Sequence, residues 1–177
     1  QHPVVRWFWG RKRLCSRVYW KLRSRFNRSP LAQRVAKALT GRQEAVIQDV
    51  EIPIEYAAEF ARFFNREVGI APVWICPVMS CDPSASYPLY PMTPGKLYVN
   101  FGFWDAVSTD HEDGYFDKKV EAKVRELHGK KSLYSNAYYS REEFWQLYNE
   151  SAYRALKARY DPTAKLKDLY EKCVLKQ

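Results

Sequence analysis

Several features common to membrane and secreted proteins are absent from this chain of 177 residues. It has no run of about 18 apolar residues, the length that a membrane-spanning helix requires. It has no signal-peptide pattern, because Arg and Lys interrupt the apolar runs near the start. It does not begin with Met, so we expect it to be a piece of a longer protein. These absences predict a cytoplasmic protein, and peripheral contact with a membrane stays open as an alternative.

Motifs for metal, redox and phosphate chemistry are also missing. The cysteines Cys15, Cys76, Cys81 and Cys173 have no CxxC spacing, and the three histidines are widely separated, so no metal site is predicted. Reduced thiols are the expected state of these cysteines. The seven glycines form no Gly-rich phosphate-binding loop.

Acidic residues are absent from the start of the chain. Residues 1–43 contain twelve Lys or Arg and no Asp or Glu. Because the net charge of the whole chain is +9, the remaining residues carry a net charge of −3. Aromatic and basic residues interleave over residues 4–26, and three interpretations stay open: contact with a missing partner domain, an anionic membrane, or nucleic acid. No nucleic-acid-binding module is recognisable, so the partner-domain interpretation is favoured and no nucleic-acid partner is predicted. We expect a basic, aromatic, helical segment at 1–43 and a separate domain at 44–177.

Hydrophobic periodicity in the second region predicts an alternation of strands and helices. Strands are expected at 45–53, 72–78, 96–104 and 133–139, and helices at 54–68, 115–128 and 151–160. The order strand, helix, strand, strand, helix, strand is the βαββαβ pattern of a ferredoxin-like α+β fold. Such a fold has a four-stranded antiparallel sheet with helices on one face, which leaves the other face to be covered or used.

Two local signals frame the last expected strand. Gly129 is placed to be the left-handed residue that ends the preceding helix. Ser140, followed three residues later by Glu143, predicts a capping box at the start of another helix. Between these signals, alternation along 133–139 places Tyr134, Asn136 and Tyr138 on one face.

Three separate motifs, taken together, resemble the C-terminal part of the Δ24-sterol reductase (seladin) family. They are QDVEIP at 48–53, PVWICP at 72–77, and LYxxxY at 133–138 followed by REEFW at 141–145. The resemblance covers nearly the whole chain. More remotely, the chain is similar to the cap domains of flavoenzymes of the vanillyl-alcohol oxidase and p-cresol methylhydroxylase superfamily.

The resemblance implies that the chain is the substrate-cap domain of an FAD-dependent oxidoreductase. FAD would be held mainly by an N-terminal FAD-binding domain that this chain lacks, with NADPH as a candidate electron donor. The implied reaction is reduction of a C=C bond in a sterol or other apolar substrate by hydride transfer from the flavin, and the isolated chain is expected to be inactive. The alternative is a non-enzymatic α+β module that binds an anionic membrane surface or nucleic acid through its basic N-terminal arm.

Alternation also selects the residues expected to line the flavin and substrate side of the sheet. Tyr134 and Asn136 are the predicted cofactor contacts, because their donors can bond flavin carbonyls. Tyr138 is the predicted catalytic acid, with solvent or the missing domain as alternative proton sources. Glu51 is expected on the same face of its strand as Asp49. The predicted substrate-binding residues are Asp49, Trp74, Cys76, Tyr98 and Asn100.

Overall fold

The computed structural model describes residues 21, 24–25, 28–30, 41–82 and 84–176. The chain divides into two compact units, Gln1–Arg42 and Gln43–Gln177. Most of the basic N-terminal segment, including most of the interleaved stretch 4–26, lies outside the described residues. Among the described residues, no helix is both long and apolar enough to cross a membrane. The fold that follows is that of the second unit.

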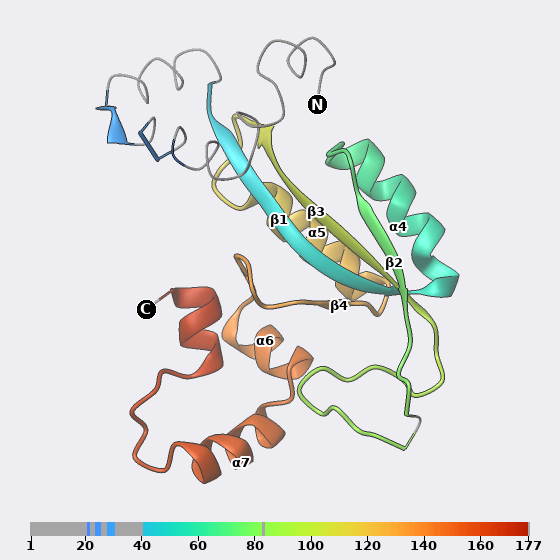
Figure 1. Cartoon of the computed structure of the whole chain (residues 1–177), viewed down its shortest axis with the longest axis vertical. Helices are drawn as coiled ribbons and strands as arrows, with labels where there is room; N and C mark the ends of the chain where they lie inside the picture. The colour runs from blue at the N-terminus through green and yellow to red at the C-terminus, as the bar shows by residue number, and fades with distance from the viewer. Residues whose placement is uncertain (1–20, 22–23, 26–27, 31–40, 83, 177) are drawn as a thin grey trace. The chain divides into compact units, whose positions relative to one another are not determined.

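The second unit is built around a four-stranded antiparallel sheet (Figure 1). Its strands are β1 (Gln43–Pro53), β2 (Trp74–Val78), β3 (Tyr98–Ser108) and β4 (Lys130–Lys131). Its helices are α4 (Ile54–Glu67), α5 (Tyr115–Glu126), α6 (Arg141–Leu147), α7 (Glu150–Tyr160) and the π-helical turn η1 (Glu171–Leu175). The strands are arranged in the order β2-β3-β1-β4. The predicted α+β class is therefore confirmed.

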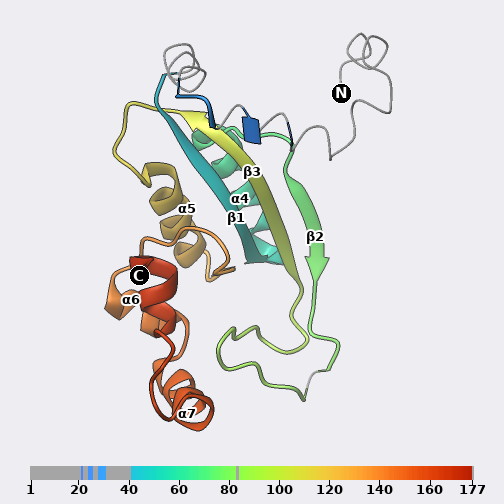
Figure 2. The ribbon, with the colours of Figure 1, turned by 60° about the vertical axis from the view of Figure 1, so that its left-hand side comes forward.

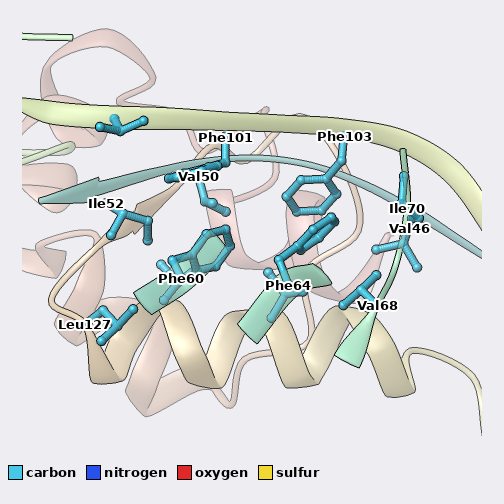
Figure 3. Close-up of a cluster of buried hydrophobic side chains, with 13 residues drawn as sticks. Val46, Val50, Ile52, Phe60, Phe64, Val68, Ile70, Phe101, Phe103 and Leu127 are labelled. Atoms are coloured by element: carbon cyan, nitrogen blue, oxygen red, sulfur yellow. The ribbon is translucent and has the colours of Figure 1, made fainter. Parts of the chain in front are cut away.

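Helices α4 and α5 cover one face of the sheet and form the main core with it (Figures 2 and 3). The ring centroids of Phe60 and Phe101 lie 4.9 Å apart, and those of Phe64 and Phe103 lie 4.3 Å apart. Burying a side chain of this size contributes about 1.5–3 kcal/mol. The apolar stripe of α4 thus fixes which face of β3 turns inward.

A second, mainly aromatic core lies in the C-terminal part of the unit. Phe144 is fully buried there, between Trp145 and Tyr148 of the same segment and Tyr170. The hydroxyl of Tyr148 donates a hydrogen bond of 2.7 Å to the backbone carbonyl of Lys131, which ties this core to β4. Helix α6 begins with the predicted capping box, since Ser140 and Glu143 each accept a hydrogen bond from the other's backbone N–H.

The prediction of a strand at 133–139 is wrong. The last strand is only Lys130–Lys131, and residues 132–140 form turns and irregular structure. The reason is tertiary, because the ammonium group of Lys131 turns inward to the carboxylate of Glu121 and also donates to the backbone carbonyl of Asn136. The chain therefore folds back on itself where alternation alone suggested an extended strand.

The left-handed residue after α5 is also different from the prediction. His128, with φ of 55°, takes that conformation, and Gly129 does not. Gly129 is instead needed for close packing, since a Cβ atom there would lie 2.8 Å from the backbone oxygen of Glu51 and 2.7 Å from Cδ1 of Ile52. The absence of a side chain lets the chain pass directly against β1.

Candidate functional site

The face of the sheet away from α4 and α5 carries the candidate site, and we call it the open face. Residues of β1 and β3 that alternate with the core positions point to it. In the strand register, Trp74, Gly102 and Asp49 lie side by side across β2, β3 and β1, and Cys76, Asn100 and Glu51 form the next row. The open face consists of Ile47, Asp49, Glu51, Trp74, Cys76, Tyr98, Asn100, Gly102 and Trp104.

Large aromatic side chains are exposed on this face. The exposed fractions are 61% for Trp74 and 52% for Trp104, and 55% for Tyr134 from the segment that follows β4. The indole nitrogen of Trp104 donates a hydrogen bond of 3.1 Å to the hydroxyl of Tyr134, so the two side chains hold each other in place. Together they offer an exposed aromatic surface, and aromatic side chains of this kind commonly line sites for ring systems.

Gly102 makes room for this arrangement. A Cβ atom at Gly102 would lie 2.7 Å from the six-membered ring of Trp104 and would collide with the carboxylate of Asp49. The indole therefore lies across the glycine backbone. Burial and a hydrogen bond with Asp49 raise the pKa of the Tyr134 phenol to about 12, so its hydroxyl group stays protonated well beyond neutral pH.

A buried carboxyl group lies in the polar row of the open face. The side-chain amide of Asn100 donates a hydrogen bond of 2.8 Å to Glu51, and the hydroxyl of Tyr90 donates to the other carboxylate oxygen. Burial raises the pKa of Glu51 above its usual range, and these two hydrogen bonds oppose that shift. A carboxyl group in this setting can hold a proton and release it.

Lys130 extends the same row on β4, where it pairs with Glu51. Burial lowers the pKa of its amine. The row from Cys76 through Asn100 and Glu51 to Lys130 therefore contains a thiol, an amide, a carboxyl group and an amine beside the exposed indoles. An apolar surface with a few convergent polar groups is typical of a small-molecule site.

The structure brings most of the predicted site residues together, since all five predicted substrate-binding residues lie on the open face. Tyr134 joins them through its hydrogen bond with Trp104. Tyr98 is buried on this face, and its hydroxyl accepts a hydrogen bond of 3.1 Å from the backbone of Thr93. Their binding roles remain predictions.

Asn136 lies at the margin of the open face, and Tyr138 lies elsewhere. Asn136 lines a pocket of about 190 Å³ together with Tyr134 and with Ile47 of the open face. Tyr138 packs against Gly114 at the start of α5, and its hydroxyl lies 3.4 Å from the carboxylate of Asp113. Tyr138 is separated from Tyr134 and Asn136 because residues 132–140 do not form the strand on which their shared face depended.

Alternation would have found some of the residues that the sequence analysis left out. Two further steps along β3 from Asn100 reach Gly102 and Trp104. Tyr90 could not be found in this way, because it comes from the Pro-rich loop between β2 and β3, which has no periodicity. Across the described part of the chain, no three His, Cys, Asp or Glu side chains are grouped as metal ligands.

Comparison with known proteins finds similarity to one group of enzymes. The chain is 24% identical to the Delta(24)-sterol reductases of Rattus norvegicus and Homo sapiens over 173 residues, which cover 97% of this chain and 31% of each relative. The Delta(24)-sterol reductase homolog of Caenorhabditis elegans is 28% identical over 131 residues, covering 72% of this chain and 24% of that protein. The chain thus spans less than a third of the length of these relatives.

No protein-family model matches the chain, and no solved structure matches it. The similarity to the rat and human enzymes extends over the open face as well as the helices, because it covers nearly every described residue. The resemblance expected from the sequence motifs is therefore confirmed, and the chain is similar over nearly its whole length to part of the Delta(24)-sterol reductases.

Proposed function

We propose that this chain is the substrate-cap domain of an FAD-dependent oxidoreductase that reduces a C=C bond in a sterol or another apolar substrate. The observation that carries the proposal is the open face, where Trp74, Trp104 and Tyr134 are exposed beside a polar row. The similarity to Delta(24)-sterol reductases supports this assignment of the chemistry. A second domain of the same protein, N-terminal to this chain, would hold FAD.

We also infer that the sheet is of the ferredoxin-like type. The strand order β2-β3-β1-β4, the antiparallel neighbours and the two helices on one face support this inference. In such a fold one face is free of helices, which agrees with the use of the open face as a cover over a cofactor and substrate.

The open face fits the ring system of FAD and does not fit its diphosphate. The indole of Trp104 lies against Gly102, and Tyr134 beside it has a protonated hydroxyl, so these residues would contact a planar aromatic group. The described residues contain no Gly-rich loop to hold phosphates, so that task is assigned to the other domain. When bound, FAD would supply hydride to one alkene carbon, with NADPH as the proposed source of electrons.

The residues of this chain would then position the substrate and hold a proton. The indoles of Trp74 and Trp104 would pack against the apolar rings and exclude water from the reacting bond. Glu51 is the group on this face best suited to hold a proton, because burial raises its pKa, and hydrogen bonds from Tyr90 and Asn100 hold its carboxyl group in place. Tyr138 remains the second proposed acid, although its hydroxyl is at the start of α5.

The proposal is tested on the full-length parent protein. We expect the purified protein to show flavin absorbance that NADPH bleaches, and that recovers without oxygen when a sterol alkene is added. A correctly folded but colourless parent protein would contradict the flavoenzyme assignment and favour the module that binds through its basic arm.

A substitution on the open face tests whether that activity depends on this part of the protein. Trp74→Ala is expected to slow the recovery driven by the alkene while leaving NADPH-driven bleaching unchanged, because Trp74, which is 61% exposed, is proposed to contact the substrate and not the flavin. Tyr87→Ala is the matched control, since the exposed fraction of Tyr87 is 58% and it lies in the loop between β2 and β3. Equal effects of the two substitutions would argue against a substrate site on the open face.

A further inference from the structure

The end of α7 and the loop after it display apolar side chains that the core does not use. Tyr160 and Leu166 are 72% and 70% exposed, more than any other large hydrophobic residue in the described part of the chain. Leu156 on the same helix is also exposed, and α7 buries none of its residues. Exposed apolar side chains that gather in one place commonly mark a contact surface.

The loop that presents Leu166 has a defined conformation. The carboxylate of Asp161 accepts hydrogen bonds of 2.9 Å from the backbone N–H groups of Lys165 and Leu166. The ammonium group of Lys157 lies 2.5 Å from the same carboxylate and donates to the backbone carbonyl of Leu166. These hydrogen bonds hold the loop against the end of α7, and in this conformation the side chain of Leu166 is exposed.

The acidic groups of this region are neutralised internally. Glu150 pairs with Arg154 at 3.1 Å, and Asp161 pairs with Lys157. Asp168 lies 3.7 Å from the guanidinium groups of both Arg154 and Arg141. The charges left for an external partner are thus positive.

Three cations near the apolar side chains have no acidic partner among the described residues. They are Arg159, Lys165 and Lys167. The guanidinium group of Arg159 lies 5.2 Å from the centre of the Tyr160 ring, so a positive charge accompanies the most exposed aromatic side chain. We call this surface the α7 tip, made of Leu156, Arg159, Tyr160, Lys165, Leu166 and Lys167.

We propose that the α7 tip is a membrane-contact site that binds the anionic phospholipid surface of a bilayer. Tyr160 and Leu166 would enter the boundary between headgroups and acyl chains, while the three cations contact lipid phosphates. This site consists of residues other than those of the open face and the basic N-terminal segment, and it does not depend on the proposed enzymatic function.

Size distinguishes a bilayer from a protein partner at this surface. A stable protein interface buries about 800 Å² on each side. An aromatic side chain buries only about 150–250 Å², so two large side chains at the end of a helix fall well short of that area. Shallow insertion of a few apolar side chains with cations around them is enough for peripheral membrane binding.

The test uses vesicle co-sedimentation of the whole chain with phosphatidylcholine alone and with added phosphatidylserine. We expect binding to vesicles that contain phosphatidylserine, weakened by salt because the charges are screened. Replacing Arg159, Lys165 and Lys167 by Gln should lower the partition coefficient on the order of 100-fold. Y160S combined with L166S should lower it by about 10-fold or more.

The matched control is M79S combined with Y87S. Met79 and Tyr87 are exposed to 55% and 58% in the loop between β2 and β3. This control should bind as the unchanged chain does. All variants keep the same N-terminal segment, so any contribution of that segment to binding is common to them.

A local measurement and a size measurement complete the test. Hydrogen exchange of the backbone at residues 156–168 should slow when phosphatidylserine vesicles are added. Equal partitioning of the tip variants and the control, or no binding of the unchanged chain, would overturn the proposal. A change of oligomeric state caused by the tip substitutions would also overturn it and would assign the surface to a protein contact.

Discussion

The ammonium nitrogen of Lys131 lies 2.5 Å from a carboxylate oxygen of Glu121, and both side chains are almost completely shielded from solvent. The same carboxylate accepts hydrogen bonds of 3.2 Å from the backbone N–H of Tyr138, and Lys131 also donates to the backbone carbonyl of Asn136. One buried ion pair thus connects α5, β4 and the irregular segment that carries Tyr134 to the open face.

Removal of one partner should be costly. Lys131→Met leaves the carboxylate of Glu121 buried without its counter-charge, so we expect the free energy of unfolding to fall by about 3–5 kcal/mol. Urea denaturation measures this. The double variant K131M and E121Q should recover part of the loss, because it removes the unpaired charge. A loss below about 1 kcal/mol for Lys131→Met, the range of surface ion pairs, would contradict a buried pair.

Stability should depend on pH through Asp117. Burial raises the pKa of Asp117 to about 6, and the hydrogen bond from Gln48 opposes that shift. Because the pKa in the folded state is above the unfolded value, the folded state binds more protons, and this residue lowers stability as pH rises from about 4 to about 6. A shift of this size corresponds to about 3 kcal/mol.

Asp117→Asn isolates this effect. We expect the variant to be more stable than the unchanged chain at pH 7, by about 1–3 kcal/mol, and about equally stable near pH 4. Thermal unfolding followed at a series of pH values provides the comparison. If the variant loses stability at pH 7, the carboxylate is satisfied in the folded chain and the expected penalty is absent.

Close packing at Gly129 predicts a steric cost. Gly129→Ala would place a methyl group against the backbone oxygen of Glu51, which cannot move aside as a side chain could, so we expect a loss of about 1–3 kcal/mol. Gly95→Ala is the comparison, because its Cβ meets nothing within 4 Å and only its positive φ opposes the change. We expect the smaller loss there, about 1 kcal/mol, in denaturant titrations.

The two proposed acids give different kinetic results in the parent protein. Glu51→Gln should slow the alkene-driven recovery of flavin absorbance by about 100-fold or more and leave NADPH-driven bleaching unchanged. Tyr138→Phe should leave both steps unchanged if Glu51 is the donor. The opposite result would identify Tyr138, and full activity of both variants would assign the proton to solvent or to the other domain.

Much of the fold could be predicted because local patterns decide it. The alternation of β1 and β3 and the apolar stripe of α4 follow from side-chain periodicity, and these elements formed close to the expected positions. The segment after Gly129 could not be predicted in this way. Its path depends on the buried ion pair of Lys131 with Glu121, a polar contact between two elements that hydrophobic periodicity does not encode.

In the candidate site, too, residues on regular strands could be predicted and most residues on irregular segments could not. Positions on regular strands, such as Asp49 and Asn100, were placed on the correct face by alternation alone. Tyr138 was grouped with Tyr134 through a strand that does not form. Tyr90 reaches Glu51 from a loop, and a loop contact of this kind depends on the whole chain path.

The shortness of β4 has a consequence for the evolution of the site. Only Val50 and Glu51 of β1 pair with it, and a single further backbone hydrogen bond of 2.9 Å joins Ser132 to Asp49. Exchanges at Tyr134, whose side chain is exposed and which follows this short strand, should therefore leave the register of β1 and β3 unchanged. We expect this position to accept side chains of different size and shape while the sheet stays constant.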